Sequence, residues 1–125
     1  EVSLKNAVNH KDLDRLKAIS ERLKHAMSQD KLYKNQDLSL NSLADQLDIK
    51  PYLISKSLSE VFNKRFNDFV NEYRVKEVQS LLKDPQYSRY TLLSLAMEAG
   101  FNSKSSFNRA IKKQLGISPK DLKAN

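Results

Sequence analysis

The sequence contains no cysteine, and only two glycines and three prolines occur among its 125 residues. Without cysteine the chain has no disulfide framework and no thiolate chemistry, which suits a reducing cytosol. The shortage of glycine and proline leaves few residues for hairpin turns, so the composition favours an all-α fold. No apolar run approaches the roughly 20 residues of a membrane-spanning helix, and no signal peptide is recognisable.

Residue patterns for catalysis or cofactor binding are also lacking. His10 and His25 are the only histidines, and neither stands at metal-ligand spacing from a carboxylate. The chain has no glycine-rich phosphate loop, and no carboxylate pair stands out from the other acidic residues. We therefore expect no enzyme activity, no metal and no cofactor.

Positive charge is what the chain has in excess. Its 22 Lys and Arg residues against 15 Asp and Glu residues give a net charge of +7. This balance suits a polyanionic partner, although basic surfaces without any partner are common. The chain begins with Glu1 rather than methionine, so we expect it to be a piece of a longer protein.

One short motif occurs twice, about fifty residues apart. The first part of the motif repeats at an offset of 52 and the second at 53, so that Leu40, Leu43 and Ala44 recur as Leu92, Leu95 and Ala96, and Ile54 and Leu58 recur as Phe107 and Ile111. A slip of one residue between the two parts is what two copies of a helix, a tight turn and a second helix would show. The repeat therefore predicts a pair of helix-turn-helix units.

The first copy carries the start and stop signals of such a unit. Ser39 stands at the N-cap of a short helix over residues 40–47. Asp48 occupies the tight turn, where a positive φ is needed, and Pro51 fits the first position of the next helix. That helix is expected to reach about Phe62, to bury Ile54, Leu58 and Phe62, and to stop at Asn63.

The second copy carries equivalent signals. Thr91 caps its first helix, Gly100 provides the turn with Phe101 packed beneath it, Ser103 caps the next helix, and Gly116 ends it. The predicted inward face consists of Phe107, Ile111 and Leu115. The predicted outward face has four cations and no acid between residues 103 and 115: Lys104, Ser105, Asn108, Arg109, Lys112 and Lys113.

A helix of this kind fits the major groove of DNA, with its first residues at the base edges and later cations at the phosphates. We expect six side chains to read bases: Tyr52, Ser55 and Lys56 in the first copy, and Lys104, Ser105 and Asn108 in the second. We expect Ser39, Ser103, Arg109, Lys112 and Lys113 to contact phosphates. The alternative for the second helix is a solvated basic face without a ligand.

Two further helices complete the expected organisation. An amphipathic pattern over residues 11–29 predicts a core helix, whose first part could instead continue a connector from a missing upstream domain. Residues 67–83 predict a longer helix between the two motifs. The expected divisions are a linker or stalk at 1–15, an N-terminal helix-turn-helix subdomain at 16–66, a linker helix at 67–84 and a C-terminal subdomain at 85–125.

The second copy resembles the signature of AraC/XylS-type transcription regulators. The likeness is carried by Leu95-Ala96, by the run from Ala99 to Arg109, by Lys112-Lys113 and by Gly116-Ile117-Ser118-Pro119. The resemblance implies seven helices, with two helix-turn-helix subdomains on a central helix and both recognition helices in successive major-groove segments of one DNA face. It also implies a C-terminal position in a protein whose upstream part senses a signal, and contact with RNA polymerase.

The sequence thus predicts sequence-specific binding of double-stranded DNA by a cytoplasmic regulator fragment, with no membrane contact of its own. For this to hold, residues 52–62 and 104–115 must project toward the same side. A homodimer through the upstream region stays open, as does a membrane-anchored sensor as the parent protein. The competing hypotheses are a helical protein-interaction module that binds an acidic partner, and nonspecific chromosome packaging.

Overall fold

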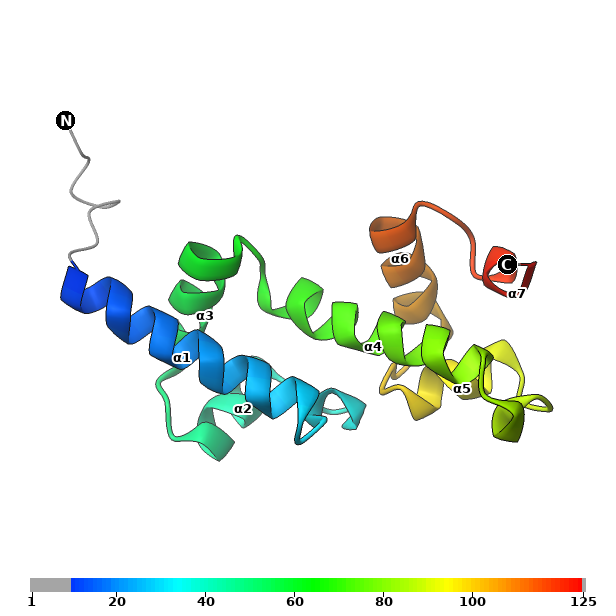
Figure 1. Ribbon diagram of the computed structural model, residues 1–125, viewed down its shortest axis with the longest axis horizontal. Coiled ribbons are helices and arrows are strands. Elements are labelled where there is room, and N and C mark those ends of the chain that lie inside the picture. The colour runs from blue at the N-terminus through cyan, green and yellow to red at the C-terminus, as the bar shows by residue number, and fades with distance from the viewer. Residues whose placement is uncertain (1–9, 125) are drawn as a thin grey trace.

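The computed structural model describes residues 10–124, with side chains for residues 10–122. The first nine residues of the predicted linker lie outside this range. The described chain folds into seven α-helices: α1 (His10–Ser28), α2 (Leu40–Leu47), α3 (Pro51–Ser57), α4 (Phe66–Leu82), α5 (Leu92–Glu98), α6 (Lys104–Leu115) and α7 (Lys120–Ala124). Three short helical turns accompany them: η2 (Leu32–Lys34), η3 (Leu58–Phe62) and η4 (Pro85–Tyr87). The predicted all-α class is confirmed, with two helix-turn-helix units on a central helix (Figure 1).

The first unit packs α1, η2, α2, α3 and the start of α4 around one apolar core. Leu16 is the first buried residue of α1, and Leu23 and Ile54 are fully buried in the centre. The last residues of this core are Phe69 and Val70 on α4. Helix α1 begins at His10, inside the segment predicted as a linker or stalk.

The second unit packs the end of α4 against α5, α6 and Leu122 of α7. Val75 and Val78 of α4 are buried in this second core. Successive residues of a helix are turned by about 100°, so the buried stripe moves around α4 and meets a different core at each end. One helix therefore belongs to both units.

The predicted caps and turns are confirmed. The hydroxyls of Ser39, Thr91 and Ser103 accept hydrogen bonds from the backbone amides of Ser42, Ser94 and Ser106 at 3.0 to 3.1 Å. Positive φ angles occur at 54° for Asp48, 53° for Asn63, 110° for Gly100 and 71° for Gly116. These local signals set where α2, α5 and α6 begin and where the helices of the two motifs end.

Two helix details differ from the prediction. The helix that begins at Pro51 changes to a wider π-type turn over Leu58–Phe62, and Phe62 is only partly buried. Leu115 was expected in the core, yet it is 37% exposed and Ala110 is buried instead. A row of residues four apart drifts by about 40° per step around an α-helix, so Leu115 has turned away from the side on which Phe107 is buried.

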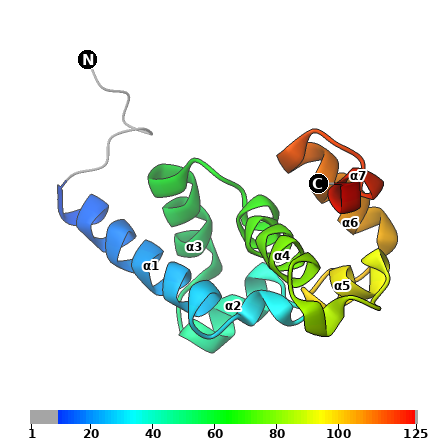
Figure 2. The same ribbon diagram turned by 45° about the vertical axis from the view of Figure 1, so that its right-hand side comes forward.

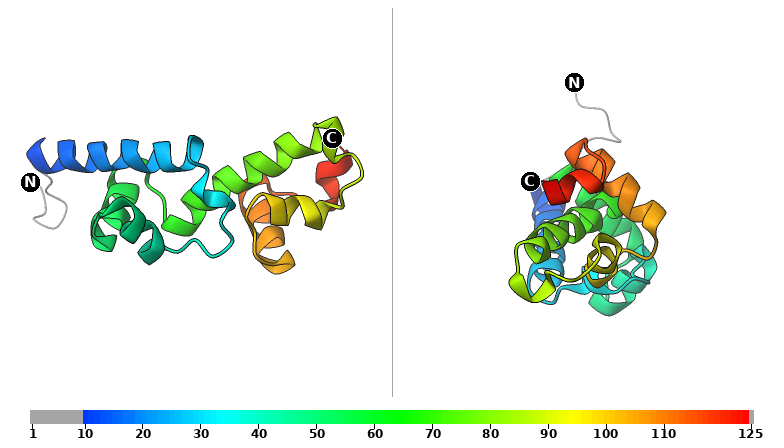
Figure 3. Two further views of the ribbon diagram at one scale, coloured as in Figure 1. Left: turned by 90° about the horizontal axis from the view of Figure 1, so that it is seen from below. Right: turned by 90° about the vertical axis from the view of Figure 1, so that its right-hand side faces the viewer.

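Helices α3 and α6 lie on the same side of the molecule. In Figures 1 and 2 both extend above α4, which runs between them. Seen from below in Figure 3 (left), the green α3 and the orange α6 lie on one side of the row formed by α1 and α4. The backbone thus has the arrangement that a two-helix contact requires.

Candidate nucleic-acid interface

The exposed side of α3 carries the residues predicted to read bases. Leu53, Ile54 and Ser57 face the core, and the Ser57 hydroxyl donates to the backbone oxygen of Leu16 at 2.7 Å. Tyr52 lies on the opposite side and is 62% exposed. Ser55 and Lys56 are exposed as well. Buried Ser57 therefore anchors α3 on α1 and directs these side chains outward, a role that the sequence pattern did not indicate.

The residues of α6 that were predicted to contact DNA are not equally exposed. Ser105, Arg109 and Lys112 are exposed and follow each other at helical spacing opposite the buried Phe107 and Ile111. Asn108, which was predicted to read a base, is half buried at the flank of this surface. Lys104 is exposed at the start of the helix. Arg109 is therefore more exposed than Asn108.

The two serines predicted to contact phosphate already have hydrogen-bond partners. Besides accepting from its capping amide, the Ser103 hydroxyl donates to the Ser106 hydroxyl at 2.9 Å. At Ser39, the backbone N–H donates to the Ser42 hydroxyl at 2.9 Å. A hydroxyl has a single proton to donate, so a phosphate at Ser103 would compete with Ser106.

Lys113 is not an unopposed cation, which corrects the interpretation from the sequence. Its ammonium group lies 2.8 and 2.9 Å from the two carboxylate oxygens of Asp68 on α4. No acid precedes Lys113 within α6, and the partner comes from 45 residues upstream. The sequence of α6 alone therefore does not reveal this acidic partner. The pair spans a cleft of about 410 Å3 between α4 and α6, which Asn71, Arg109 and Gln114 also line.

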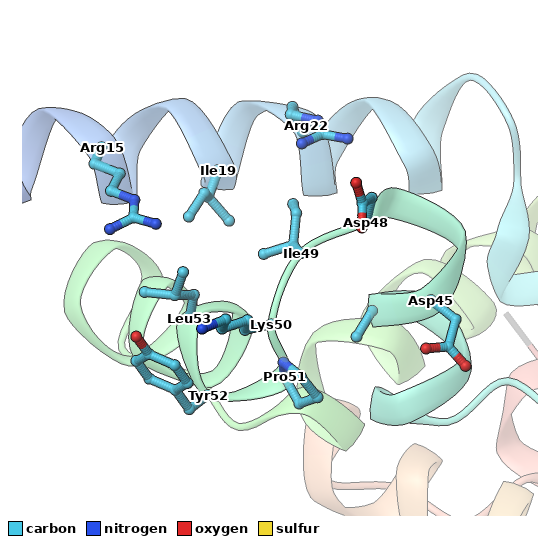
Figure 4. Close-up of a pocket in the computed structure, with 11 residues that line it drawn as sticks. Arg15, Ile19, Arg22, Asp45, Asp48, Ile49, Lys50, Pro51, Tyr52 and Leu53 are labelled. Atoms are coloured by element: carbon cyan, nitrogen blue, oxygen red, sulfur yellow. The ribbon is translucent and has the colours of Figure 1, made fainter.

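A groove beside the start of α3 contains cations that the sequence reasoning missed. It has a volume of about 630 Å3 and lies between α1 and the turn that precedes α3. Figure 4 shows Arg15 of α1 pointing toward α3, with Lys50 and Tyr52 on the facing wall. Arg22 donates to the backbone oxygen of Leu47 at 2.6 Å. Asp45 and Asp48 line the same groove, so its net charge is only weakly positive.

The remaining chemistry of the described residues is limited. Between residues 10 and 124, no three His, Cys, Asp or Glu side chains gather in a group that could hold a metal ion. No helix in that range is both long enough and apolar enough to cross a membrane. Most of the exposed side chains of α3 and α6 are hydrogen-bond donors or cations, which suit an anionic ligand.

Comparisons with known proteins agree with this arrangement. Residues 43–125 match the family described as a helix-turn-helix domain. An uncharacterised HTH-type transcriptional regulator of Staphylococcus aureus (strain COL) is 28% identical over 94 residues, which are 75% of this chain and 12% of that protein. The melibiose operon regulatory protein of Escherichia coli (strain K12) is 26% identical over 89 residues, or 71% of this chain and 28% of that protein. The chain thus spans a minor part of both curated relatives.

A solved structure has the same fold. The crystal structure of the C-terminal domain of the two-component response regulator yesN from Fusobacterium nucleatum superposes with a TM-score of 0.65. The two chains are 21% identical, and the match covers 85% of this chain and 98% of that one. At this identity the likeness concerns the fold alone.

Proposed function

We propose that this chain reads a specific DNA duplex with two helices at once. The chain belongs to the AraC/XylS type of helix-turn-helix family. It is a non-enzymatic DNA-binding domain of a transcription regulator. The observation that carries the proposal is the position of α3 and α6 on one side of the molecule, each with an exposed polar face. Helices placed in this way can enter two successive segments of the major groove.

We assign base contacts first to the residues near the start of each helix. In α3 these are Tyr52, Ser55 and Lys56, and in α6 they are Lys104, Ser105 and Asn108. Arg109 was predicted to contact phosphate, but its exposed position one turn after Ser105 also supports a base contact. An arginine can donate two hydrogen bonds to guanine, which is the commonest specific contact in the major groove.

Phosphate contacts would fix the position of the domain on the duplex without reading sequence. Lys112 is exposed near the end of α6 and suits this role. Lys113 would first have to exchange Asp68 for a phosphate, and Ser39 and Ser103 would use hydroxyls that now cap helices. Arg15 and Lys50 supply additional cations beside α3.

The two helices have different sequences, so one domain should prefer an asymmetric site. Entry into successive major-groove segments sets the two contact regions about one helical turn apart, roughly 34 Å. If the straight duplex does not match the spacing of the helices, the DNA must bend, at a cost on the order of a few kcal/mol.

The regulated process belongs to the whole protein. By analogy with the E. coli relative, whose name states that it regulates the melibiose operon, we propose that the parent protein controls transcription of an operon in the cytoplasm. Contact of the bound domain with RNA polymerase, and dimerisation through an upstream part, are further proposals that rest on family resemblance.

A mobility-shift titration over a salt series tests the proposed function. Bound fragments would first be selected from a genomic pool, and their affinity compared with that of random duplex. We expect a preferred site and a steep fall of log K with log salt, because each neutralised phosphate releases counterions. No DNA binding would favour the module for an acidic protein partner, and equal binding of random duplex would favour nonspecific packaging.

A further inference from the structure

The two units touch each other directly, and not only through the helix they share. The contact centres on the backbone oxygen of Tyr33, in the η2 turn of the first unit. Arg74 approaches this oxygen from the middle of α4, and Gly100 approaches it from the tight turn of the second unit. The three residues come from three different parts of the chain and meet at one point.

Arg74 connects the two units through its guanidinium group. Its Nε donates to the Tyr33 oxygen at 2.8 Å and its Nη2 donates to the Asn35 oxygen at 3.0 Å. The same group lies 5.9 Å from the centre of the Phe101 ring, which is fully buried in the second core. Arginine has a planar set of donors that can serve two acceptors at once, and it also stacks on aromatic rings. Lysine could reach only one of the two carbonyls well.

Gly100 makes the close approach possible. A side-chain carbon at this position would lie 2.0 Å from the Tyr33 oxygen and 2.9 Å from Nε of Arg74. A second link runs beside it, since the Gln36 side chain donates to the backbone oxygen of Met97 at 3.2 Å. The Tyr33 hydroxyl donates to Glu77 at 3.1 Å, which holds the η2 turn on α4.

This junction lies where the shared helix passes from one core to the other. The first core ends at Val70 and the second begins at Val75, so Arg74 stands between them. Long helices curve gently along their length, so α4 alone leaves some freedom for the two units to tilt. The contacts at Tyr33 lie to one side of that point and oppose tilting or twisting of the units about α4. Small movements matter because neighbouring base pairs are only about 3.4 Å apart along the DNA.

We propose that Arg74 is a positioning residue that fixes α3 relative to α6 and thereby sets the spacing between the two DNA segments that the domain reads. The inference rests on the proposed function, namely that both helices bind one duplex. Two linked binding contacts strengthen each other only when the linkage lets both engage the DNA at once. The combined affinity can then exceed that of a single contact by a factor of about 100 or more. Loosening the junction should therefore change selectivity for spacing rather than contact with either segment.

The test compares wild type with Arg74→Lys on duplexes whose two contact segments are separated by the preferred spacing, or by one or two base pairs more or fewer. Wild type should lose about tenfold or more when the spacing is wrong, because simultaneous engagement fails. Arg74→Lys should bind the preferred spacing more weakly and discriminate between spacings less than threefold. Its affinity for a duplex with one intact segment should equal that of wild type.

Arg22→Ala is the matched control. Arg22 also donates to a backbone carbonyl, that of Leu47, but both residues belong to the first unit. This variant should melt at a lower temperature and keep the wild-type dependence on spacing. Gln36→Ala gives a second, milder change at the junction if Arg74→Lys does not fold.

A measurement without DNA separates the inference from the proposed function. Because the chain has no cysteine, Ser55→Cys and Ser105→Cys provide unique sites for spin labels on α3 and α6. The distribution of label distances should be narrow in the wild-type background and broad with Arg74→Lys. An unchanged distribution, or unchanged spacing selectivity in a folded Arg74→Lys protein, overturns the inference. If wild type binds no preferred site, the proposed function fails, while the distance distribution still decides the role of Arg74.

Discussion

Lys113 of α6 binds both carboxylate oxygens of Asp68 on α4, at 2.8 and 2.9 Å. The pair joins the two units on the side where α6 presents its cations. It places a negative charge next to a surface that we propose to meet phosphates. The acid therefore limits how much of the positive charge of α6 is available to DNA.

Asp68→Asn should make the domain bind DNA more tightly and with a stronger dependence on salt. Lys113 would be free to neutralise a phosphate, so the slope of log K against log salt should steepen by about one unit. Exposed ion pairs contribute little, so the free energy of unfolding should change by less than about 1 kcal/mol. A titration at several salt concentrations checks this, and weaker binding at every concentration would argue that Asp68 orients Lys113 productively.

Arg109→Ala and Lys112→Ala should affect DNA binding in different ways. Loss of a base contact at Arg109 should cost about 1–3 kcal/mol on the preferred site and relax the preference at one base pair. Loss of a phosphate contact at Lys112 should weaken all duplexes alike and reduce the salt slope by about one unit. Binding to a set of single-base variants measures both.

Asn108→Ala tests whether Asn108 reads a base in addition to Arg109. If half-buried Asn108 reads a base, its removal should relax preference at one position by about 1–3 kcal/mol, as expected for Arg109. If all three α6 variants behave identically on preferred and random duplex, the division into base and phosphate contacts is wrong.

Gly100→Ala should destabilise the domain far more than Gly116→Ala. Both positions have positive φ, at 110° and 71°, so alanine is strained at each by about 1–2 kcal/mol. At Gly116 no atom lies within 4 Å of the added carbon, whereas at Gly100 the Tyr33 oxygen lies at 2.0 Å. Urea unfolding compares the two variants, and equal midpoints would mean that the two units are not in close contact in solution.

Stability should fall in alkali through Tyr33. Burial, and secondarily the Glu77 carboxylate beside it, raises the pKa of Tyr33 to about 12. A tyrosine whose folded pKa exceeds its unfolded value of 10.0 stabilises the fold fully below pH 10. That contribution is lost as pH rises toward 12, up to about 2–3 kcal/mol at 1.36 kcal/mol per unit.

Tyr33→Phe isolates this effect from the other groups that titrate in the same range. The difference in free energy of unfolding between wild type and Tyr33→Phe should be constant up to about pH 9, because the phenol is then neutral in both states. It should shift in favour of Tyr33→Phe between pH 10 and 12. A difference that stays constant up to pH 12 would contradict the burial of the hydroxyl beside Glu77.

Much of the fold could be predicted because its signals are local. The capping hydroxyls of Ser39, Thr91 and Ser103 bond to amides three residues further along the chain. Asp48 and Gly116 have positive φ angles, which aspartate and glycine tolerate better than most residues. Each of these features depends on only a few neighbouring residues, so the ends of these helices can be predicted from the sequence.

The remaining features depend on residues that are distant in the chain. The partners of Lys113 and Arg74 lie 45 and 41 residues away, and nothing in a single helix indicates them. Val75 is buried because a second core begins beside it. Leu115 is exposed because α6 has turned past its core by that point. Packing between elements decides these cases, and a periodic pattern describes only one element at a time.

A chemical protection footprint of the domain on its selected duplex tests the central claim most directly. Two helices acting together should protect two major-groove segments, with centres about 10 base pairs apart and on one face of the DNA. Protection of a single segment, or of segments on opposite faces, would contradict binding by α3 and α6 as a pair.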